Sequence, residues 1–199
     1  GSLTNRSSTT ETNWFAYDLE GRMTGATIHR IESGQSLLMT NRYLYNGAGI
    51  RVRAEMTRSV AGGAWVNETN VFLNDPQNLT GFSQVLEELP VAGAVPTATY
   101  TLGGQVLSQE KGGAVSHLMP DGNGSTRLLT DAGGAITNRF TYDAFGVALD
   151  FTNSVINPAR TKILYGGEQH DAGLNQIYLR ARYYHAPTGR FGARDALEG

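Results

Sequence analysis

The chain has 199 residues, of which 40% are hydrophobic and 17% are charged, with a formal net charge of −2. This composition supplies enough apolar surface for a buried core and excludes an intrinsically disordered chain. The absence of cysteine excludes disulfides and thiol nucleophiles, and the scattered Lys and Arg residues argue against a nucleic-acid partner.

Short β-prone runs separated by Gly, Asn and Asp predict strands along most of the chain. Most runs contain four to eight residues and recur roughly every ten to fifteen. This spacing favours hairpins in an antiparallel meander over βαβ units. The predicted strands cover residues 14–17, 27–31, 36–45, 51–57, 65–73, 97–102, 105–109, 114–119, 126–130, 136–142, 162–165 and 177–183.

Residues 83–89 are the one stretch with helix-like composition, and Pro90 closes it. Isolated helices below roughly 12 residues are marginal, and the charged and apolar residues form no clean helical face. Helix and strand therefore both remain open here. We expect residues 91–96 and 152–158 to form loops.

A turn motif recurs along the chain, in which Asp or Asn is followed three residues later by Gly. The first copies follow aromatic residues at an interval of 28, and a degenerate copy begins at His170-Asp171. The motif residues are Tyr17, Asp18 and Gly21; Tyr45, Asn46 and Gly49; Asp131 and Gly134; and Tyr142, Asp143 and Gly146.

Each position of this motif has a physical role. The Asp or Asn side chain can accept hydrogen bonds from backbone N–H groups two residues on, and Gly tolerates the positive φ that closes the hairpin. The preceding aromatic residues alternate, as in Phe15 and Tyr17. Residues two apart project from one face of a strand, so stacked copies predict an aromatic ladder on one face of a sheet.

These motifs resemble the RHS/YD-repeat family, which includes Rhs toxin shells, the C components of Tc toxins and teneurins. The stretch YDLEGRMT, from Tyr17, resembles a YD repeat. The block YLRARYYHAPTGRFGARD, from Tyr178 to Asp195, is similar to the end of the RHS-repeat-associated core domain, and residues 118–146 resemble the segment before it.

The resemblance implies an all-β fold, in which an antiparallel β-hairpin strip forms a curved sheet in a hollow shell. It divides the chain into a YD-repeat strip at residues 3–116 and a core domain, truncated before the usual cleavage motif, at residues 117–199. Gly1-Ser2 looks like an expression-tag remnant.

In several toxin members of the family, the core domain also severs the enclosed effector by aspartyl autoproteolysis. By resemblance, Asp195 would be a catalytic aspartate and Arg182 an arginine that supports cleavage. This chain departs from the family pattern at His170, His185-Ala186 and Asp195-Ala196. The family's second aspartate motif lies beyond Gly199, so the predicted site is incomplete, and structural roles for Arg182 and Asp195 are the simpler interpretation.

Metal and cofactor sites are not predicted. The four histidines (His29, His117, His170 and His185) lack the short spacing of a helical zinc site. Residues 121–125 resemble the opening of a calcium loop, but its twelfth position is Ala132, which lacks a carboxylate. A turn explains this stretch more simply.

Three functions therefore remain in view. The first is a shell segment that encloses or presents a C-terminal effector polypeptide, with further repeats of the parent chain as neighbours. The second is part of an aspartyl autoprotease, and the third is a binding module that uses exposed residues such as Trp14 or Trp65. We expect self-association through exposed strand edges, no membrane span, and a secreted or cell-surface, bacterial parent protein.

Overall fold

The computed structural model describes residues 4–194 and contains two antiparallel β-sheets. The larger sheet has twelve strands, which lie in sequence order. They are β1 (Asn5–Ser7), β2 (Glu11–Tyr17), β3 (Met23–Glu32), β4 (Gln35–Tyr45), β5 (Arg51–Val60), β6 (Val66–Asp75), β7 (Gln84–Leu89), β8 (Ala98–Leu102), β9 (Val106–Lys111), β10 (Ala114–Pro120), β11 (Thr126–Thr130) and β12 (Ile136–Arg139).

The smaller sheet has four strands and lies near the end of the chain. It consists of β13 (Gln169–Asp171), β14 (Gln176–Leu179), β15 (Arg182–His185) and β16 (Arg190–Phe191). Of two short 3₁₀ turns, η1 (Tyr165–Gly167) precedes β13, and η2 (Ala186–Thr188) lies between β15 and β16. None of the described residues forms a helix long and apolar enough to cross a membrane.

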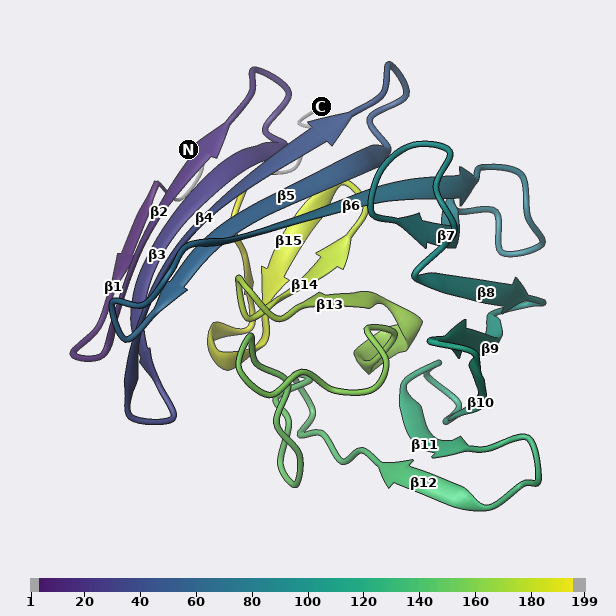
Figure 1. Cartoon of the computed structure of the whole chain (residues 1–199). Helices are drawn as coiled ribbons and strands as arrows, with labels where there is room; N and C mark the ends of the chain where they lie inside the picture. Colours follow the sequence, from purple (N-terminus) through teal and green to yellow (C-terminus); the bar gives the residue numbers. More distant parts are fainter. Residues whose placement is uncertain (1–3, 195–199) are drawn as a thin grey trace.

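The larger sheet curls around the smaller one (Figure 1). In the figure, β1 to β6 form one side of the curve, β7 to β12 continue around it, and β13 to β15 lie within it. The inside of the curve is therefore filled by the chain's own C-terminal segment, by which we mean residues 141–194.

The alternation of side chains explains which face turns inward. In β4, Leu37, Met39, Asn41 and Tyr43 are buried, whereas the residues between them are exposed. Successive side chains on a strand point to opposite faces, so one buried set fixes the inner face of the whole strand.

Five turns of the larger sheet and the segment after it share one hydrogen-bond pattern. In the first, the Oδ1 atom of Asp18 accepts from the backbone N–H groups of Glu20 at 3.0 Å and Arg22 at 2.9 Å, and Gly21 has a φ of 77°. The same bonds, to the second and fourth residues on, recur from Asn46, Asp121, Asp131 and Asp143.

Arginine links two of these turns to an aromatic ring from elsewhere in the chain. Arg22 donates to Asp18 Oδ2 at 2.7 Å and lies 5.3 Å from the centre of the Tyr45 ring. Arg127 donates to Asp121 Oδ2 at 2.7 Å and lies 5.3 Å from the Tyr142 ring. Residues 121–125 are thus part of a turn, with Arg127 as the partner of the carboxylate.

The all-β prediction is confirmed, and residues 84–89 are a strand, which decides between the two interpretations of that stretch. Two predicted strands are wrong. Residues 162–165 form only an isolated bridge, between Ile163 and Gln169, because η1 begins at Tyr165. Residues 177–183 are split into β14 and β15 by a tight turn at Arg180, which has a φ of 60°. The short strands β1, β13 and β16 were not predicted.

The buried apolar residues form two clusters. The first joins the inner face of β2 to β4 to the smaller sheet, and its members are Phe15, Met23, Ala26, Ile28, Met39, Tyr43, Leu174, Tyr178 and Tyr183. The second joins β8 to β11 to residues 140–164, and its members are Ala98, Tyr100, Val106, Leu118, Leu129, Phe140, Tyr142, Ile163 and Leu164. The motif aromatics therefore lie on one inner surface but contribute to two separate clusters.

Candidate functional site

The candidate functional site is the contact surface between the inner face of the larger sheet and the C-terminal segment. This inner face carries several buried polar side chains. Burying a polar group is unfavourable unless it is hydrogen-bonded, so their partners show what the face is built to hold. The members discussed below are Arg30, Arg51, Glu88 and Gln109.

Arg51 lies at the centre of this surface. It follows the turn at Asn46, opens β5 and is 5% exposed. Its guanidinium donates to Tyr183 Oη and to Gln169 Oε1, each at 2.5 Å, and its backbone N–H donates to Tyr178 Oη at 3.2 Å. One residue of the larger sheet thus bonds to β13, β14 and β15 together.

Aromatic rings surround the Arg51 guanidinium. Its Cζ atom lies 3.9 Å from the centre of the Tyr178 ring and 4.7 Å from that of Phe72, and the rings of Tyr43 and Tyr183 are within 6 Å. A cation over a ring face is attracted by the ring quadrupole, and the attraction grows when water is excluded. We call Arg51, Tyr43, Asp171, Tyr178 and Tyr183 the Arg51 cluster.

Asp171 supplies the negative charge of the cluster. One of its oxygens accepts from Tyr43 Oη at 2.9 Å and lies 3.9 Å from Arg51 Nη1. Its other oxygen accepts from the backbone N–H of Leu174 at 3.1 Å. The degenerate copy of the turn motif therefore differs from the other five, because it directs its carboxylate toward the larger sheet.

Burial and the neighbouring groups together determine the protonation states of Arg51 and of the tyrosines in the cluster. Burial alone would lower the pKa of Arg51, but Tyr183, Tyr178 and Asp171 outweigh it and raise that pKa, so Arg51 stays cationic. Burial raises the pKa of Tyr43 and of Tyr183 well above the usual value, so both phenols stay neutral and able to donate. The cluster thus combines the Arg51 cation with neutral tyrosine hydroxyl groups.

A second arginine binds the loop before β14. Arg30 donates to the carbonyl oxygens of Gly173 at 3.1 Å and Ala172 at 3.0 Å, and its Nε donates to Glu32 at 2.8 Å. Glu32 in turn accepts from the backbone N–H of Ile156 at 2.9 Å. The two ends of this ion pair therefore hold two different loops of the C-terminal segment.

The other half of the larger sheet uses a carboxylate. Glu88 on β7 is 2% exposed, accepts from Tyr100 Oη at 2.9 Å and forms an ion pair with Lys162. Burial would raise the pKa of Glu88, but Lys162 outweighs burial and lowers it, so Glu88 is ionised. Gln109 adds a bond to the Arg160 carbonyl oxygen at 3.0 Å.

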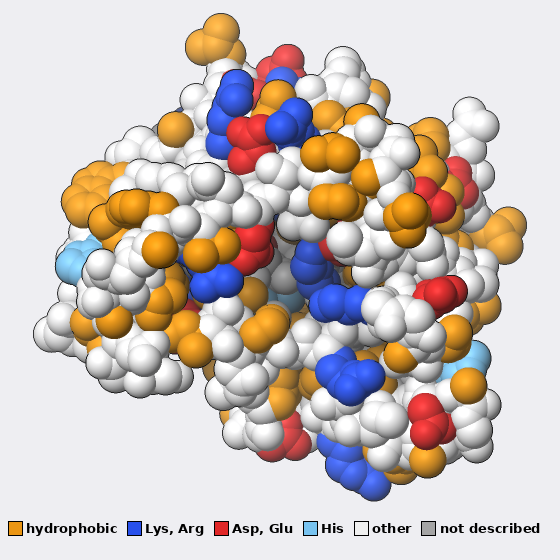
Figure 2. All heavy atoms as spheres, viewed as in Figure 1, with side chains coloured by type: hydrophobic (Ala, Val, Ile, Leu, Met, Phe, Trp, Pro, Cys, Tyr) orange, Lys and Arg blue, Asp and Glu red, His pale blue; other side chains and the backbone are white. Residues whose placement is uncertain are grey.

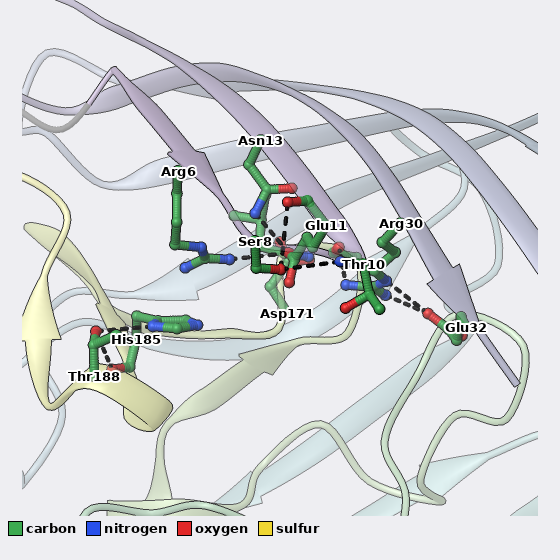
Figure 3. A network of polar contacts seen from close by, with 12 residues as sticks. Arg6, Ser8, Thr10, Glu11, Asn13, Arg30, Glu32, Asp171, His185 and Thr188 are labelled. Carbon is green, nitrogen blue, oxygen red and sulfur yellow. Dashed lines mark hydrogen bonds and ion pairs between the residues drawn. The ribbon is translucent and has the colours of Figure 1, made fainter.

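Figure 3 shows the outer end of the contact surface, where Arg6 and Glu11 of the larger sheet lie opposite His185 and Thr188 of the C-terminal segment. Glu11 accepts from Arg6 at 3.0 Å and from Asn13 Nδ2 at 2.6 Å. His185 Nδ1 and Thr188 Oγ1 are 2.9 Å apart. Burial, together with the Arg6 charge, lowers the pKa of His185 to about 4.

The predicted tyrosines each bond to backbone carbonyl oxygen. Tyr17 Oη donates to Gly192 at 3.2 Å, Tyr45 Oη to Met23 at 2.6 Å and Tyr142 Oη to Thr126 at 3.1 Å. The bonds of Tyr17 and Tyr142 thus join the larger sheet to the C-terminal segment, whereas the bond of Tyr45 joins β4 to β3 within the larger sheet.

Of the two residues assigned to cleavage, Asp195 lies outside the described residues. Arg182 lies on β15, and its guanidinium is 4.0 Å from the centre of the Phe191 ring on β16. Arg190 and Arg194 line a groove of about 900 Å³ beside this strand pair, together with Tyr17, Gln176 and His185. The cleavage assignment stays a prediction.

Arg51, Asp171 and Tyr183 are the residues that sequence reasoning missed. Asp171 was noticed as part of a degenerate repeat, and Tyr183 as part of the block from Tyr178 to Asp195. Nothing local marks Arg51, because the groups to which it donates hydrogen bonds lie more than a hundred residues away. Among residues 4–194, no group of three or more His, Asp or Glu side chains is placed to hold a metal ion.

No protein-family model matches the chain, and no curated protein matches it. Solved structures with a similar fold include the crystal structure of TcdB2-TccC3 without its hypervariable C-terminal region, with a TM-score of 0.50, 16% identity, and coverage of 100% of this chain and 9% of that one. TcdB2-TccC3 itself gives a TM-score of 0.48 and 16% identity over 100% of this chain and 9% of that one. A Photorhabdus luminescens Tc holotoxin pore gives a TM-score of 0.44 and 16% identity, with coverage of 96% of this chain and 8% of that one.

The chain thus spans less than a tenth of the length of these toxin chains, and at this identity the likeness concerns the fold alone. The class that the fold defines is a curved antiparallel β-strip similar to part of a TcdB2-TccC3 chain.

Proposed function

We propose that this chain is a wall segment of an RHS-type shell, which encloses or presents an effector polypeptide of its parent protein. The observation that carries the proposal is the contact surface around Arg51, where the inner face of a curved β-strip holds the chain's own C-terminal segment through buried bonds. The five repeated turns and the similarity to TcdB2-TccC3 support it, since the resembling family includes the C components of Tc toxins.

The mechanism under this proposal is physical containment. A closed wall separates a polypeptide from its surroundings, and the C-terminal segment covers the inside of the strip. Because the strands pair in sequence order, further repeats of a parent chain would add to the free edges of β1 and β12.

Protease protection in the parent protein tests this function. The polypeptide that follows residue 199 is expected to resist trypsin in the wild type and to be cleaved after Arg51→Met, which removes the central cation of the contact surface. Arg53→Met on the same strand is the matched control, since Arg53 is exposed. An effector polypeptide cleaved as fast inside the wild-type parent as when it is isolated would overturn the proposal.

The second function that we propose is aspartyl autoproteolysis, with Asp195 as a catalytic carboxylate and Arg182 in support. The observation that favours it is the arginine-lined groove beside β15 and β16. A chain extended beyond Gly199 is expected to yield two fragments, and Asp195→Asn to leave it intact. An extended wild-type chain that stays whole would remove this function.

A binding function rests on exposed tryptophans. Trp14 and Trp65 are 49% and 54% exposed, which makes their rings available to a glycan or a surface protein. Binding on a glycan array that disappears in Trp14→Ala or Trp65→Ala would support this function, whereas an array without signal would argue against it.

A further inference from the structure

A cavity of about 230 Å³ lies between the inner face of β4 to β6 and residues 153–173. Figure 2 shows a hollow near the middle of this face of the molecule, with Lys or Arg side chains on its rim. The cavity borders the Arg51 cluster, but the bonds that hold the C-terminal segment do not account for all of the polar groups that line it.

Three residues that line the cavity each carry a buried N–H donor with no hydrogen-bond acceptor among the described residues. The atoms are Asn41 Nδ2, Arg51 Nε and Gln169 Nε2. The three residues are all at least nine-tenths buried. The orientation of the Gln169 amide is fixed, because its oxygen accepts from Arg51.

The pattern of unpaired atoms separates donors from acceptors. Every unpaired buried side-chain nitrogen among residues 4–194 belongs to a residue of this cavity, whereas the unpaired buried side-chain oxygens belong to residues that do not line it. An unpaired buried donor is destabilising by about 1–3 kcal/mol. Three such donors around one space therefore point to a ligand whose polar atoms only accept hydrogen bonds.

The charges of the lining residues favour an anion. Arg51, Arg58, Lys111 and Lys162 give four cations against three carboxylates. All three carboxylates already have partners within 3 Å: Glu55 is 2.8 Å from Arg53, Glu68 is 2.8 Å from Arg58, and Asp171 accepts from Tyr43 at 2.9 Å. Of the cations, Arg58 is paired with Glu68 and Lys162 with Glu88, so the unpaired Arg51 Nε and Lys111 supply the positive charge that faces the space. His170 also lines the cavity, and burial lowers its pKa to about 4, so the ring is neutral at pH 7.

We propose that this cavity binds a small oxyanion, either a carboxylate or a phosphate group, through Asn41, Arg51 and Gln169. The volume lies below the roughly 300–1,000 Å³ of typical ligand pockets, which favours a compact anion over a peptide. The site is independent of the shell function, because it concerns a ligand within the wall rather than a polypeptide enclosed by it.

Titration calorimetry with inorganic phosphate and, separately, with sodium acetate tests this site, using sodium chloride at matched ionic strength as the reference. Saturable binding of either oxyanion supports the proposal and identifies which group the site prefers. Heat that matches chloride for both anions would overturn it, and would assign the cavity to ordered water.

Asn41→Asp provides the sharper test, because it exchanges a donor for a negative charge at nearly unchanged size. We expect binding to weaken by about tenfold or more, as the loss of one hydrogen bond to a charged group implies. Asn138→Asp makes the same change on β12, outside the cavity, and is expected to bind like the wild type. Gln169→Glu serves as a second variant, so a folding defect at position 41 leaves the test intact. Unchanged binding in Asn41→Asp or in Gln169→Glu would overturn the site.

Discussion

The two halves of the curved sheet hold the C-terminal segment by different means. Strands β3 to β6 have 10 or 11 residues, and their half binds the smaller sheet through arginines, Arg30 and Arg51. Strands β7 to β12 have four to seven residues, and their half binds residues 159–165 through an apolar cluster and one buried carboxylate, Glu88.

This difference shows how one strip can adapt to two kinds of surface. The smaller sheet presents tyrosine hydroxyls and a carboxylate, which suit a cation, whereas the loop at residues 159–165 presents carbonyl groups and aliphatic side chains. The repeated turns set the path of the wall, and residues within the strands determine what the wall holds.

The largest effect is expected at the centre of the first half. Arg51→Met removes a buried cation and leaves Asp171, the Tyr183 hydroxyl and Gln169 Oε1 without that partner, so we expect the free energy of unfolding to fall by about 3–5 kcal/mol. Urea denaturation followed by tryptophan fluorescence measures it. Arg53→Met, at an exposed position on the same strand, is expected to change stability by less than about 1 kcal/mol. Equal losses in both variants would show that the Arg51 cluster does not hold the smaller sheet against the first half.

The second half should respond to the loss of apolar volume. Leu129 is fully buried in the second cluster, so Leu129→Ala is expected to lower the free energy of unfolding by about 2–4 kcal/mol. Leu107, which is 46% exposed, supplies the control variant Leu107→Ala, with a much smaller loss.

The same denaturation curves show whether the halves unfold together. Both clusters include residues of the C-terminal segment, so a single transition is expected in the wild type and in Leu129→Ala. Two separated transitions in the variant would show that the halves are independent units.

One substitution compares a turn of the first half with a turn of the C-terminal segment. Gly21 has a φ of 77°, and a Cβ atom there would meet nothing within 4 Å, so Gly21→Ala carries only the backbone penalty of about 1 kcal/mol. Gly146 has a φ of 94°, and a Cβ atom would lie 2.7 Å from the Tyr165 ring. We therefore expect Gly146→Ala to lower the midpoint of thermal unfolding more than Gly21→Ala does, with a loss of about 2–3 kcal/mol. The reverse order would mean that Tyr165 moves aside freely.

The features that depend on residues close together in the sequence could be predicted from it. The bonds of the repeated turns join residues two and four apart, so Asp18 and Gly21 identify their own turn. The strand alternation of residues 36–45 is local in the same sense. The turn at Arg180 was missed because its positive φ occurs at a residue that rarely adopts it, without the usual Gly or Asn.

The residues of the candidate site could not be predicted from the sequence, because they are far apart along the chain. Arg51 and Tyr183 are 132 residues apart, and Tyr43 and Asp171 are 128 apart. Only the curvature of the sheet brings these side chains together, and neither the turn motif nor the alternation of apolar residues specifies that curvature. The resemblance supplied the idea of a wall but not the residues by which the wall holds its contents.

Acid should loosen the packing of the smaller sheet against the first half, because His170 lies on β13 and lines the space under β4 to β6. Burial lowers the pKa of His170 to about 4, with the charge of Arg30 in support and that of Asp171 opposed, whereas the usual value is 6.5. A histidine whose folded pKa is lowered binds its proton more readily when unfolded, so its contribution to stability is complete above about pH 6.5 and is lost as the pH falls toward 4.

We expect the free energy of unfolding to fall by roughly 1–2 kcal/mol between pH 7 and pH 5, and His170→Asn to remove part of that fall. Thermal unfolding from pH 7.5 to pH 4.5 measures it, with the exposed His29→Asn as the matched variant. Carboxylates such as Glu88 and Glu11, whose pKa values are lowered, add their own loss at lower pH in all variants alike. If His170→Asn left the pH profile unchanged, the His170 ring would be as well hydrated in the folded chain as in the unfolded one. The smaller sheet would then exclude less water from the first half than the burial of Arg51 implies.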